Sequence, residues 1–551
     1  MDKVKQTRLC KIGILLFYWL LSLLLTYAYF KHHCIFDGED FQFHFARLYE
    51  LIQTKIGAFP IISTLTFGQT GNQVQVFYPN QLLYPLAMII KVTHRPILMI
   101  CLYLLLIDFL TFISCHWAAA KIGKSPLFCL TFAIIYTSSF YHLVNMYMRF
   151  DLGEMWAAVF LPLTLVGFYL VIHQHGGRLM LFVGLIGLLF SHLLTLALVG
   201  GILFIWFVVY IGLNTDRYKI IKHLLQVGIA VLGCGSIFLL PFAAHYLIVP
   251  TGLQATQIAP LYLKTTIWTK QWWALTHNVI FAEHGNYTAG ILIIVLLIMT
   301  TLGFCYFHQK VTFNNWIILL GSWLALMLTT NLFPWKWFSG TFVNIIQFPF
   351  RFNTFVTLGV AWCVAELLTM IKWRNVRIWS FLLVGSMSLI LAVNAIHQFV
   401  AAAPRGNHPL STQTYSSYID NHSANDYFPK QASSDIGELP WRPAYINGRK
   451  VFLNCDPMNN GVTYHISTNK KHNRFDLPFL CYSQHYHVTN WGRPIAYQFS
   501  HRGTFAIKTK TKNNLIHIQY CPTLIDRFSW VLSAIAFSGL SLIILWNKYY
   551  R

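Results

Sequence analysis

Residues 95–120 read RPILMICLYLLLIDFLTFISCHWAAA, a run in which Arg95 and Asp108 are the only Lys, Arg, Asp or Glu side chains. A helix needs about 20 mostly apolar residues to cross the hydrocarbon core of a bilayer, so this stretch predicts a transmembrane helix. Further stretches of this kind occupy 11–30, 126–144, 152–173, 178–192, 194–213, 222–247, 289–307, 313–331, 350–371, 377–400 and 526–547. We therefore expect a mainly α-helical, polytopic bundle of about twelve spans.

The composition of the whole chain agrees with a membrane protein. Of its 551 residues, 56% are hydrophobic and only 11% are charged, whereas a soluble domain usually has about 25% charged residues. The chain has 40 Lys and Arg against 18 Asp and Glu. These basic residues cluster in short loops between the apolar runs, which is how Lys and Arg set membrane topology. We therefore expect membrane lipids, and no nucleic acid, as partners.

The basic loops predict the orientation of the chain. With the N-terminus inside, the basic loops 121–125, 174–178, 214–222, 308–312 and 372–377 all fall on the cytoplasmic side, as the positive-inside rule requires. Treating 178–213 as one span would put the basic 214–222 loop outside, so two spans are preferred. The sequence thus predicts a multi-pass protein of the plasma membrane with both termini in the cytoplasm.

The composition changes sharply after residue 403. Alternating stretches such as 504–509 and 515–520 have the period of β-strands, and Asn-Gly pairs mark turns. We expect a transmembrane bundle over 1–403, with amphipathic helices in its exterior loop 31–94. An extracytoplasmic, β-rich domain, a small antiparallel sandwich, should follow over 404–525, and 526–551 should form a last span with a basic cytoplasmic tail.

The strongest chemical signal follows the first span. Residues 37–47 read DGEDFQFHFAR, with three carboxylates within four residues. Asp40, His44 and Arg47 have helical spacing, so a helix would place them on one face. One interpretation makes Asp37, Glu39 or Asp40 the general base that takes a proton from an acceptor hydroxyl, with His44 orienting it or binding a phosphate. The other interpretation is a solvated helix N-terminus, where acidic residues are favourable.

Ionisable residues at three other exterior positions extend this group. Arg149, Asp151 and Glu154 stand at the entry to a span, where charges are costly. They pair with one another or share a site with the first-loop carboxylates. Arg351 is either a bidentate ligand for a lipid phosphate or an interfacial arginine beside aromatic residues. The candidate substrate- or phosphate-binding residues are His44, Arg47, Arg149, Asp151, Glu154, His192, Gln347 and Arg351.

The pattern resembles a known superfamily. An acidic motif after the first span, amphipathic helices in the first exterior loop and many spans are similar to the GT-C glycosyltransferases, which use polyprenyl-phosphate donors. Several pieces are also similar to a bacterial multispanning family labelled as related to 6-pyruvoyl-tetrahydropterin synthase, and to YfhO-like membrane proteins. These pieces are Asp37–Arg47, Phe67–Pro79, Gln347–Arg351, Asn425–Pro429 and Leu477–Tyr520.

The resemblance implies an activity and its residues. A sugar would move from a polyprenyl-phosphate carrier to a cell-envelope glycan or lipid on the outer face, with Asp37 or Asp40 as the base. A divalent cation, Mg²⁺ or Mn²⁺, is a possible cofactor, with Asp37 and Asp40 as its possible ligands. The pterin label implies zinc enzymology, but the exterior domain has no His-triad spacing.

Two other classes of function remain open. A lipid or glycolipid transporter often has inverted repeats and midplane charges, whereas here no repeat is visible and the charges lie at the outer edge. A non-catalytic envelope protein would use its β domain to bind glycan or a partner.

Labelling of single cysteines tests the orientation. In a background with the 11 native cysteines replaced by serine, a cysteine placed between positions 37 and 47 should react with an impermeant maleimide on intact cells. A cysteine in the 372–377 loop should react only after the cells are opened. Labelling of the 37–47 positions only in opened cells would reverse the predicted orientation.

Overall fold

The structure is a computed structural model that describes residues 2–55, 60–173, 176–213, 216–249, 252–253, 261–267, 269, 272, 276–280, 287–402, 410–411, 427–434 and 437–549. The chain divides into two compact units. The helix unit contains Met1–Phe41, Arg95–Val227 and Ile258–Thr412, and the sheet unit contains Gln42–His94, Gly228–Gln257 and Gln413–Arg551. The expected domain boundary at 403/404 and Asn425-Asp426 of the family-like motif lie outside the described residues.

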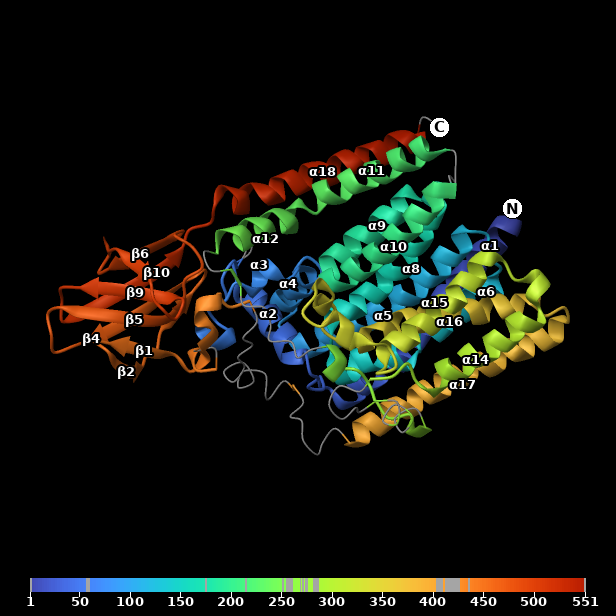
Figure 1. Ribbon diagram of the computed structural model, residues 1–551, viewed down its shortest axis with the longest axis horizontal. Coiled ribbons are helices and arrows are strands. Elements are labelled where there is room, and N and C mark those ends of the chain that lie inside the picture. Colours follow the sequence, from blue (N-terminus) through green and yellow to red (C-terminus); the bar gives the residue numbers. More distant parts are fainter. Residues whose placement is uncertain are drawn as a thin grey trace. The chain divides into compact units, whose positions relative to one another are not determined.

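The helix unit is a bundle of long apolar helices, which Figure 1 shows lying roughly alongside one another. Its main helices are α1 (Asp2–His32), α5 (Pro96–Lys121), α6 (Pro126–Thr137), α8 (Leu152–Ile172), α9 (Arg178–Ser191), α10 (Leu193–Leu213), α14 (Ile291–Tyr306), α15 (Phe313–Thr329), α16 (Asn353–Met370) and α17 (Arg374–Ala402). α11 (Arg217–Cys234) begins in this unit and ends in the sheet unit. Each stretch predicted as a span is thus largely helical where it is described.

Hydropathy and length separate these helices into two groups. Among the described residues, seven helices are long and apolar enough to cross a membrane, or up to nine if each of two bent pairs is one span. Three more predicted spans are apolar helices of only 14, 16 and 17 residues, namely α9, α14 and α15. At about 1.5 Å per residue they measure roughly 21–26 Å, less than the ~30 Å hydrocarbon core. The count of twelve therefore depends on these three helices.

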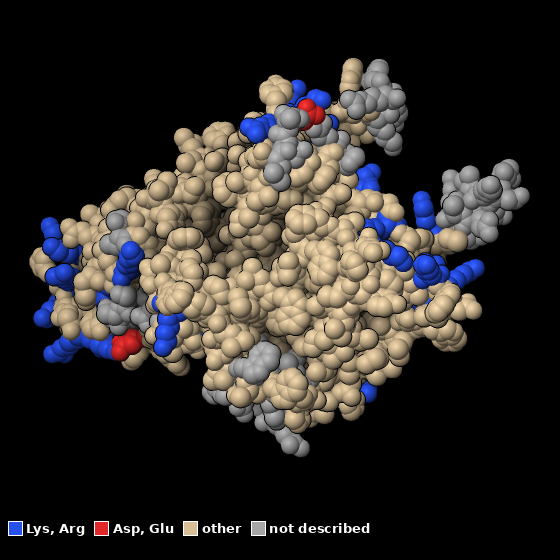
Figure 2. Space-filling model, turned by 45° about the vertical axis from the view of Figure 1, so that its right-hand side comes forward, with Lys and Arg blue, Asp and Glu red and all other residues tan. Residues whose placement is uncertain are grey.

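The surface of the bundle is apolar, as a lipid-facing surface requires. Large side chains such as Ile205 on α10, Leu302 on α14 and Leu320 on α15 are more than 60% exposed. Figure 2 shows a broad face without Lys, Arg, Asp or Glu side chains. Exposed apolar area on this scale marks an interaction surface, and in helices of this hydropathy the partner is the lipid bilayer.

Glycines bring α8 and α9 into close contact. A Cβ atom added at Gly184 of α9 would lie 2.6 Å from the backbone nitrogen of Thr164 of α8, and one at Gly187 would lie 2.2 Å from the ring of Phe160. Small residues let membrane helices approach in this way. The close packing brings the start of α8, which carries Asp151 and Glu154, near the end of α9, which His192 follows.

Two charged residues within the predicted spans have partners that the sequence did not reveal. Asp108 of α5 lies 2.7 Å from Nε2 of His142, which belongs to the short helix α7 (Phe140–Leu143), and both are buried. Glu366 of α16 pairs with Lys124 in the α5–α6 loop. Charges at membrane depth are costly without a partner, so both pairs stabilise the bundle.

The predicted antiparallel β domain is confirmed, and it is a sandwich. One sheet has the order β2-β1-β5-β9-β8 and the other β3-β4-β10-β6-β7. The strands are β1 (Pro443–Ile446), β2 (Arg449–Phe452), β3 (Asp456–Met458), β4 (Gly461–Ser467), β5 (Asn473–Leu480), β6 (Tyr486–Asn490), β7 (Arg493–Pro494), β8 (Tyr497–Phe499), β9 (Thr504–Thr509) and β10 (Asn513–Tyr520).

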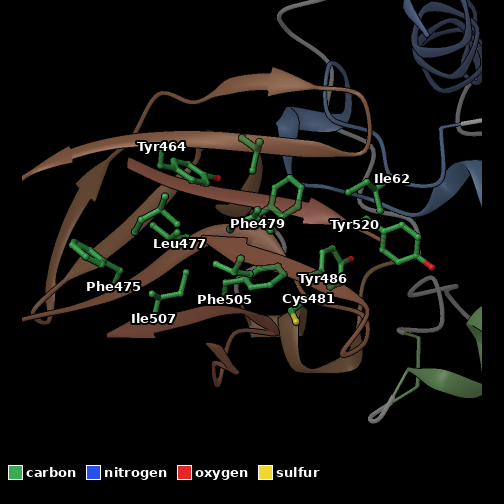
Figure 3. Close-up of a cluster of buried hydrophobic side chains, with 14 of the residues drawn as sticks. Ile62, Tyr464, Phe475, Leu477, Phe479, Cys481, Tyr486, Phe505, Ile507 and Tyr520 are labelled. Carbon is green, nitrogen blue, oxygen red and sulfur yellow. The ribbon is translucent and has the colours of Figure 1, made fainter. Parts of the chain in front are cut away.

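The core of this sandwich follows from strand alternation. Phe475 and Leu477 of β5, with Phe505 and Ile507 of β9, point inward and are at most 1% exposed. Figure 3 shows them beside Tyr464 and Tyr486 of the opposite sheet. Successive side chains of a strand face opposite sides, and Arg474 of β5 and Lys508 of β9, which alternate with these residues, are exposed.

The other elements of the sheet unit are α2 (Phe41–Gln53), α3 (Val74–Phe77), α4 (Leu83–Thr93), α12 (Ser236–Ile248) and α18 (Leu524–Tyr549). α2 differs from the surface helix that was expected, because His44 and Arg47 are 2% and 1% exposed, like its apolar residues. Small residues pack α12 on α18, where Ser236 Oγ donates to the Ser529 carbonyl oxygen at 3.1 Å.

Truncation of the sandwich core should destabilise the sheet unit. Phe505→Ala removes a fully buried ring that packs on Phe479 and Tyr486, so we expect a loss of about 3–5 kcal/mol. Phe452→Ala is the matched control, because that ring is 69% exposed and its loss should change stability by about 0.5 kcal/mol or less. Thermal unfolding of the detergent-solubilised chain measures both. Equal midpoints for the two variants would contradict the assigned core.

Candidate active site

Residues of the turn at 144–150 bind the backbone of the acidic segment 37–40. The π-helical turn Val144–Arg149 ends at Phe150, whose φ of +53° lies in the left-handed region. The backbone carbonyl oxygens of Met148 and Arg149 accept hydrogen bonds from the backbone nitrogens of Glu39 (3.0 Å) and Asp40 (2.7 Å).

Gly38 makes this approach possible. A Cβ atom at this position would lie 2.8 Å from the carbonyl carbon of Arg149 and 2.8 Å from the carbonyl oxygen of Met148. A larger residue would therefore push the acidic segment away from the turn.

A buried carboxylate joins two arginines next to this turn. Oε1 of Glu154 accepts from Nε of Arg351 at 2.8 Å and lies 2.9 Å from Nη1 of Arg149. Its other oxygen, Oε2, accepts from the Tyr141 hydroxyl at 3.0 Å. The side chains of Arg149 and Glu154 are 2% and 4% exposed. Unpaired charges at such burial are very costly, so each member of this cluster requires the others.

Asp151 completes the environment of Arg149. Its Oδ2 accepts from Arg149 Nη2 at 2.8 Å, and its Oδ1 caps α8 by accepting from the backbone nitrogen of Glu154 at 3.0 Å. Asn145, one turn before Arg149, accepts from Nη1 at 2.8 Å. The Nη1 and Nη2 groups of Arg149 are thus directed mainly at protein oxygens.

Asp40 is the accessible carboxylate of the cluster. Its Oδ2 lies 3.2 Å from Nη2 of Arg149, and 41% of its side chain is exposed. Burial raises the pKa of Asp40 to about 7, against the lowering effect of Arg149. The Asp40 carboxylate is thus partly surrounded by protein and still accessible. With this pKa it can exchange a proton near neutral pH.

Arg351 and Lys264 form a second cationic position. Arg351 Nη1 donates to the Gln347 side chain at 2.8 Å and to the Ile346 carbonyl oxygen at 3.1 Å. Its Nη2 group has no hydrogen-bond partner among the residues that the structure describes. The Lys264 ammonium and the Arg351 guanidinium lie 4.1 and 5.1 Å from the Phe348 ring.

Lys264 and Arg351 place two positive charges near each other. Burial and the nearby Arg351 charge lower the pKa of Lys264. Within the described part of the chain, Lys264 has no carboxylate partner. A phosphate would remove the repulsion between the two cations and accept from Arg351 Nη2.

Asp151, Glu154 and His192 form a possible metal-binding group, since their ligand atoms lie within 4.8 Å of one another. His192 is buried, and its Nδ1 lies 2.8 Å from the Thr195 hydroxyl. However, Glu154 Oε1 and Asp151 Oδ2 already bind guanidinium groups at 2.8–2.9 Å. A divalent cation would have to displace an arginine, so this arrangement does not fit one.

The sequence-predicted residues are distributed between the two units. The helix unit contains Asp37, Glu39, Asp40, Arg149, Asp151, Glu154, His192, Gln347 and Arg351. His44 and Arg47 belong to the sheet unit, where Arg47 donates to Asn80 Oδ1 at 2.6 Å and lies 4.2 Å from the Tyr78 ring.

Four residues of the site were missed from the sequence. Tyr141 and Asn145 bind the charged side chains, and Lys264 adds the second cation. Tyr287 is buried, and burial together with Glu39 raises the pKa of its phenol. Of these four residues, only Asn145 could have been inferred from the sequence, because it precedes Arg149 by one helical turn.

The apolar helices and their buried ionic cluster define a multi-pass membrane protein. No family model matches the sequence, and a search of curated proteins gives no match. Among solved structures, the arabinofuranosyltransferase AftD from Mycobacteria is similar, with a TM-score of 0.47 and 12% identity over 72% of this chain. The alignment covers 27% of AftD, so this chain spans about a quarter of that structure.

Removal of the Glu154 charge should destabilise the helix unit. Glu154→Gln leaves Arg149 and Arg351 buried without their shared carboxylate, at an expected cost of about 3–5 kcal/mol. Thermal unfolding in detergent at pH 8 provides the measurement.

Asp40→Asn is the matched control. The pKa of Asp40 is about 7 in the folded protein and about 4 when unfolded, so folding favours its protonated form. Ionised Asp40 therefore weakens folding above pH 7, and stability is regained as the pH falls toward 4. Asp40→Asn should be at least as stable as the native chain at pH 8. An unchanged midpoint for Glu154→Gln would contradict the proposed cluster.

Proposed function

We propose that this protein is a membrane glycosyltransferase that moves a sugar from a polyprenyl-phosphate carrier to a cell-envelope glycan or lipid. The observation that carries the proposal is Asp40, an accessible carboxylate with a pKa of about 7 that lies 3.2 Å from a buried arginine. A general base works best when its pKa is near the operating pH. Among the first-loop carboxylates, Asp40 is therefore the proposed catalytic base.

The reaction is a single displacement. As the acceptor hydroxyl oxygen attacks the anomeric carbon, Asp40 takes the hydroxyl proton. The bond from the anomeric carbon to the phosphate oxygen breaks, and its electron pair leaves with the polyprenyl phosphate. This leaving group is already stable as an anion, so it needs charge stabilisation and not a separate acid.

Arg351 and Lys264 are the proposed ligands of the donor phosphate. Arg351 Nη2 is available, and Glu154 fixes the guanidinium through Nε at 2.8 Å. Gln347 holds Nη1 at 2.8 Å. Preorganised donors of this kind stabilise charge that develops in the transition state. Because the carboxylates beside them are already bound to arginines, the proposed mechanism has no step through a divalent cation.

The proposed setting is the outer face of the plasma membrane. The basic loops 121–125, 214–222 and 372–377 favour a cytoplasmic location for both termini. The first-loop carboxylates and the β domain over 404–525 would then lie outside. The twelve-span count belongs to this proposal, with α9, α14 and α15 crossing a locally thinned or obliquely packed region.

Asp40→Asn should abolish sugar transfer without loss of folding. We expect a loss of about 10²–10⁴-fold in turnover, measured as consumption of radiolabelled polyprenyl-phosphate sugars by purified protein with envelope lipid and glycan acceptors. Native kcat/KM should fall about tenfold per pH unit below pH 7, because protonated Asp40 cannot act as a base.

Lys264→Gln and Asp37→Asn are the informative controls. Lys264→Gln should raise the KM for the donor with a smaller effect on kcat, and Asp37→Asn should retain activity. Undiminished turnover in both Asp37→Asn and Asp40→Asn would remove the first loop from the mechanism. Donor binding without consumption by the native protein would favour a transporter or a glycan-binding protein.

A further inference from the structure

A basic groove of about 630 Å³ crosses one side of the β sandwich. Its lining includes Arg474 of β5, Lys508 of β9, Lys510 just after β9, and Arg493 and Trp491 of the β6–β7 hairpin. Grooves of this volume are typical of small-ligand and oligomer sites. The groove belongs entirely to the sheet unit and shares no residue with the candidate active site.

The four cations of the groove have no acidic partner among the residues that the structure describes. No ion pair or side-chain hydrogen bond holds Arg474, Arg493, Lys508 or Lys510 within the described residues. The nearest acidic residue on β5, Asp476, accepts instead from Thr504 Oγ1 at 2.5 Å and lies 3.5 Å from Arg502 Nη1. The groove therefore keeps a positive charge that none of the described acidic side chains neutralises.

Two of these cations lie opposite each other on neighbouring strands. Arg474 of β5 and Lys508 of β9 are direct partners in the antiparallel register. Like charges in such positions destabilise a sheet, so a bound anion would relieve the repulsion. The whole segment 443–520 has ten Lys and Arg against two Asp. In Figure 2, one of the groups of Lys and Arg side chains lies over the sheet unit.

Trp491 adds a fixed apolar surface to the charged groove. Trp491 and Gly492 form the hairpin turn with φ of +52° and +76°, and a bulky residue is rare in this left-handed region. The indole Nε1 donates to the Asn513 carbonyl oxygen at 3.1 Å, while 61% of the residue is exposed. Such an oriented, exposed ring can pack against the C–H face of a sugar or polyol.

We propose that this groove binds an anionic glycan chain, whose charges are phosphodiesters or uronate carboxylates. Lys508 and Lys510 are two residues apart, a separation of ~6.7 Å along an extended strand, and successive anions of such a chain can span it. The concave shape and the indole surface favour a chain over a flat membrane. The binding is independent of sugar transfer and would hold an envelope polymer on the β domain.

Binding to defined polyanions tests the proposal with the full-length protein in detergent. The probes are a fluorescent short poly(glycerol phosphate) chain, an oligogalacturonate of similar length, neutral dextran and phosphatidylglycerol vesicles. The native protein should bind at least one of the two anionic chains and not dextran. Binding should weaken with added salt, because exposed charges are screened.

Matched double variants separate a built site from general charge attraction. Arg474→Gln with Lys508→Gln should weaken binding roughly tenfold or more, and Trp491→Ala should also weaken it. Arg449→Gln with Lys471→Gln removes the same charge from exposed positions outside the groove lining and should have a much smaller effect.

Three outcomes would overturn the proposal. They are equal losses in the two double variants, no binding to either anionic chain, and binding to the vesicles alone. None of these outcomes depends on Asp40 or on turnover. Glycan binding in the groove can therefore be refuted while the enzyme proposal stands, and the enzyme proposal can be refuted while glycan binding stands.

Discussion

The carboxylate of Glu154 is the interaction on which the helix unit's polar site depends. It accepts from Arg351 at 2.8 Å and lies 2.9 Å from Arg149, and all three side chains are at most 9% exposed. These residues come from the start of α8, the π-helical turn before it and the segment before α16. Because two buried cations share one carboxylate, the cluster fixes three separate parts of the chain at once.

This constraint also explains why the neighbouring acidic side chains differ in their access to solvent. Asp151 and Glu154 are committed to the arginines and are buried. Asp40 touches the same cluster only through Arg149 and retains access to solvent, so burial raises its pKa while its carboxylate can still meet a substrate. One ionic network thus separates carboxylates that are committed to arginines from one that stays accessible.

The sequence predicted the elements better than their partners. Apolar run lengths located the helices, and strand alternation located β9 and β10, because both signals are local. The pairing of Arg149 with Asp151 and Glu154 was one of two open interpretations.

Other features depend on tertiary contacts that no local pattern encodes. The choice of Asp40 over Asp37 rests on the 3.2 Å contact between the Asp40 carboxylate and Arg149, which lies 109 positions away. The partner of Asp108 is His142, 34 positions away, and Lys264 meets Arg351 only through folding. α2 was expected on a surface because its polar spacing is amphipathic, yet the sheet unit buries His44 and Arg47.

The most direct test of the account is an infrared difference titration of the Asp40 carboxyl group in the purified protein. The protonated C=O band that disappears in Asp40→Asn should titrate with a midpoint of about pH 7 in the native chain. A midpoint near pH 4, the ordinary value for an aspartate, would show that the cluster does not prepare Asp40 as a base and would contradict the proposed mechanism.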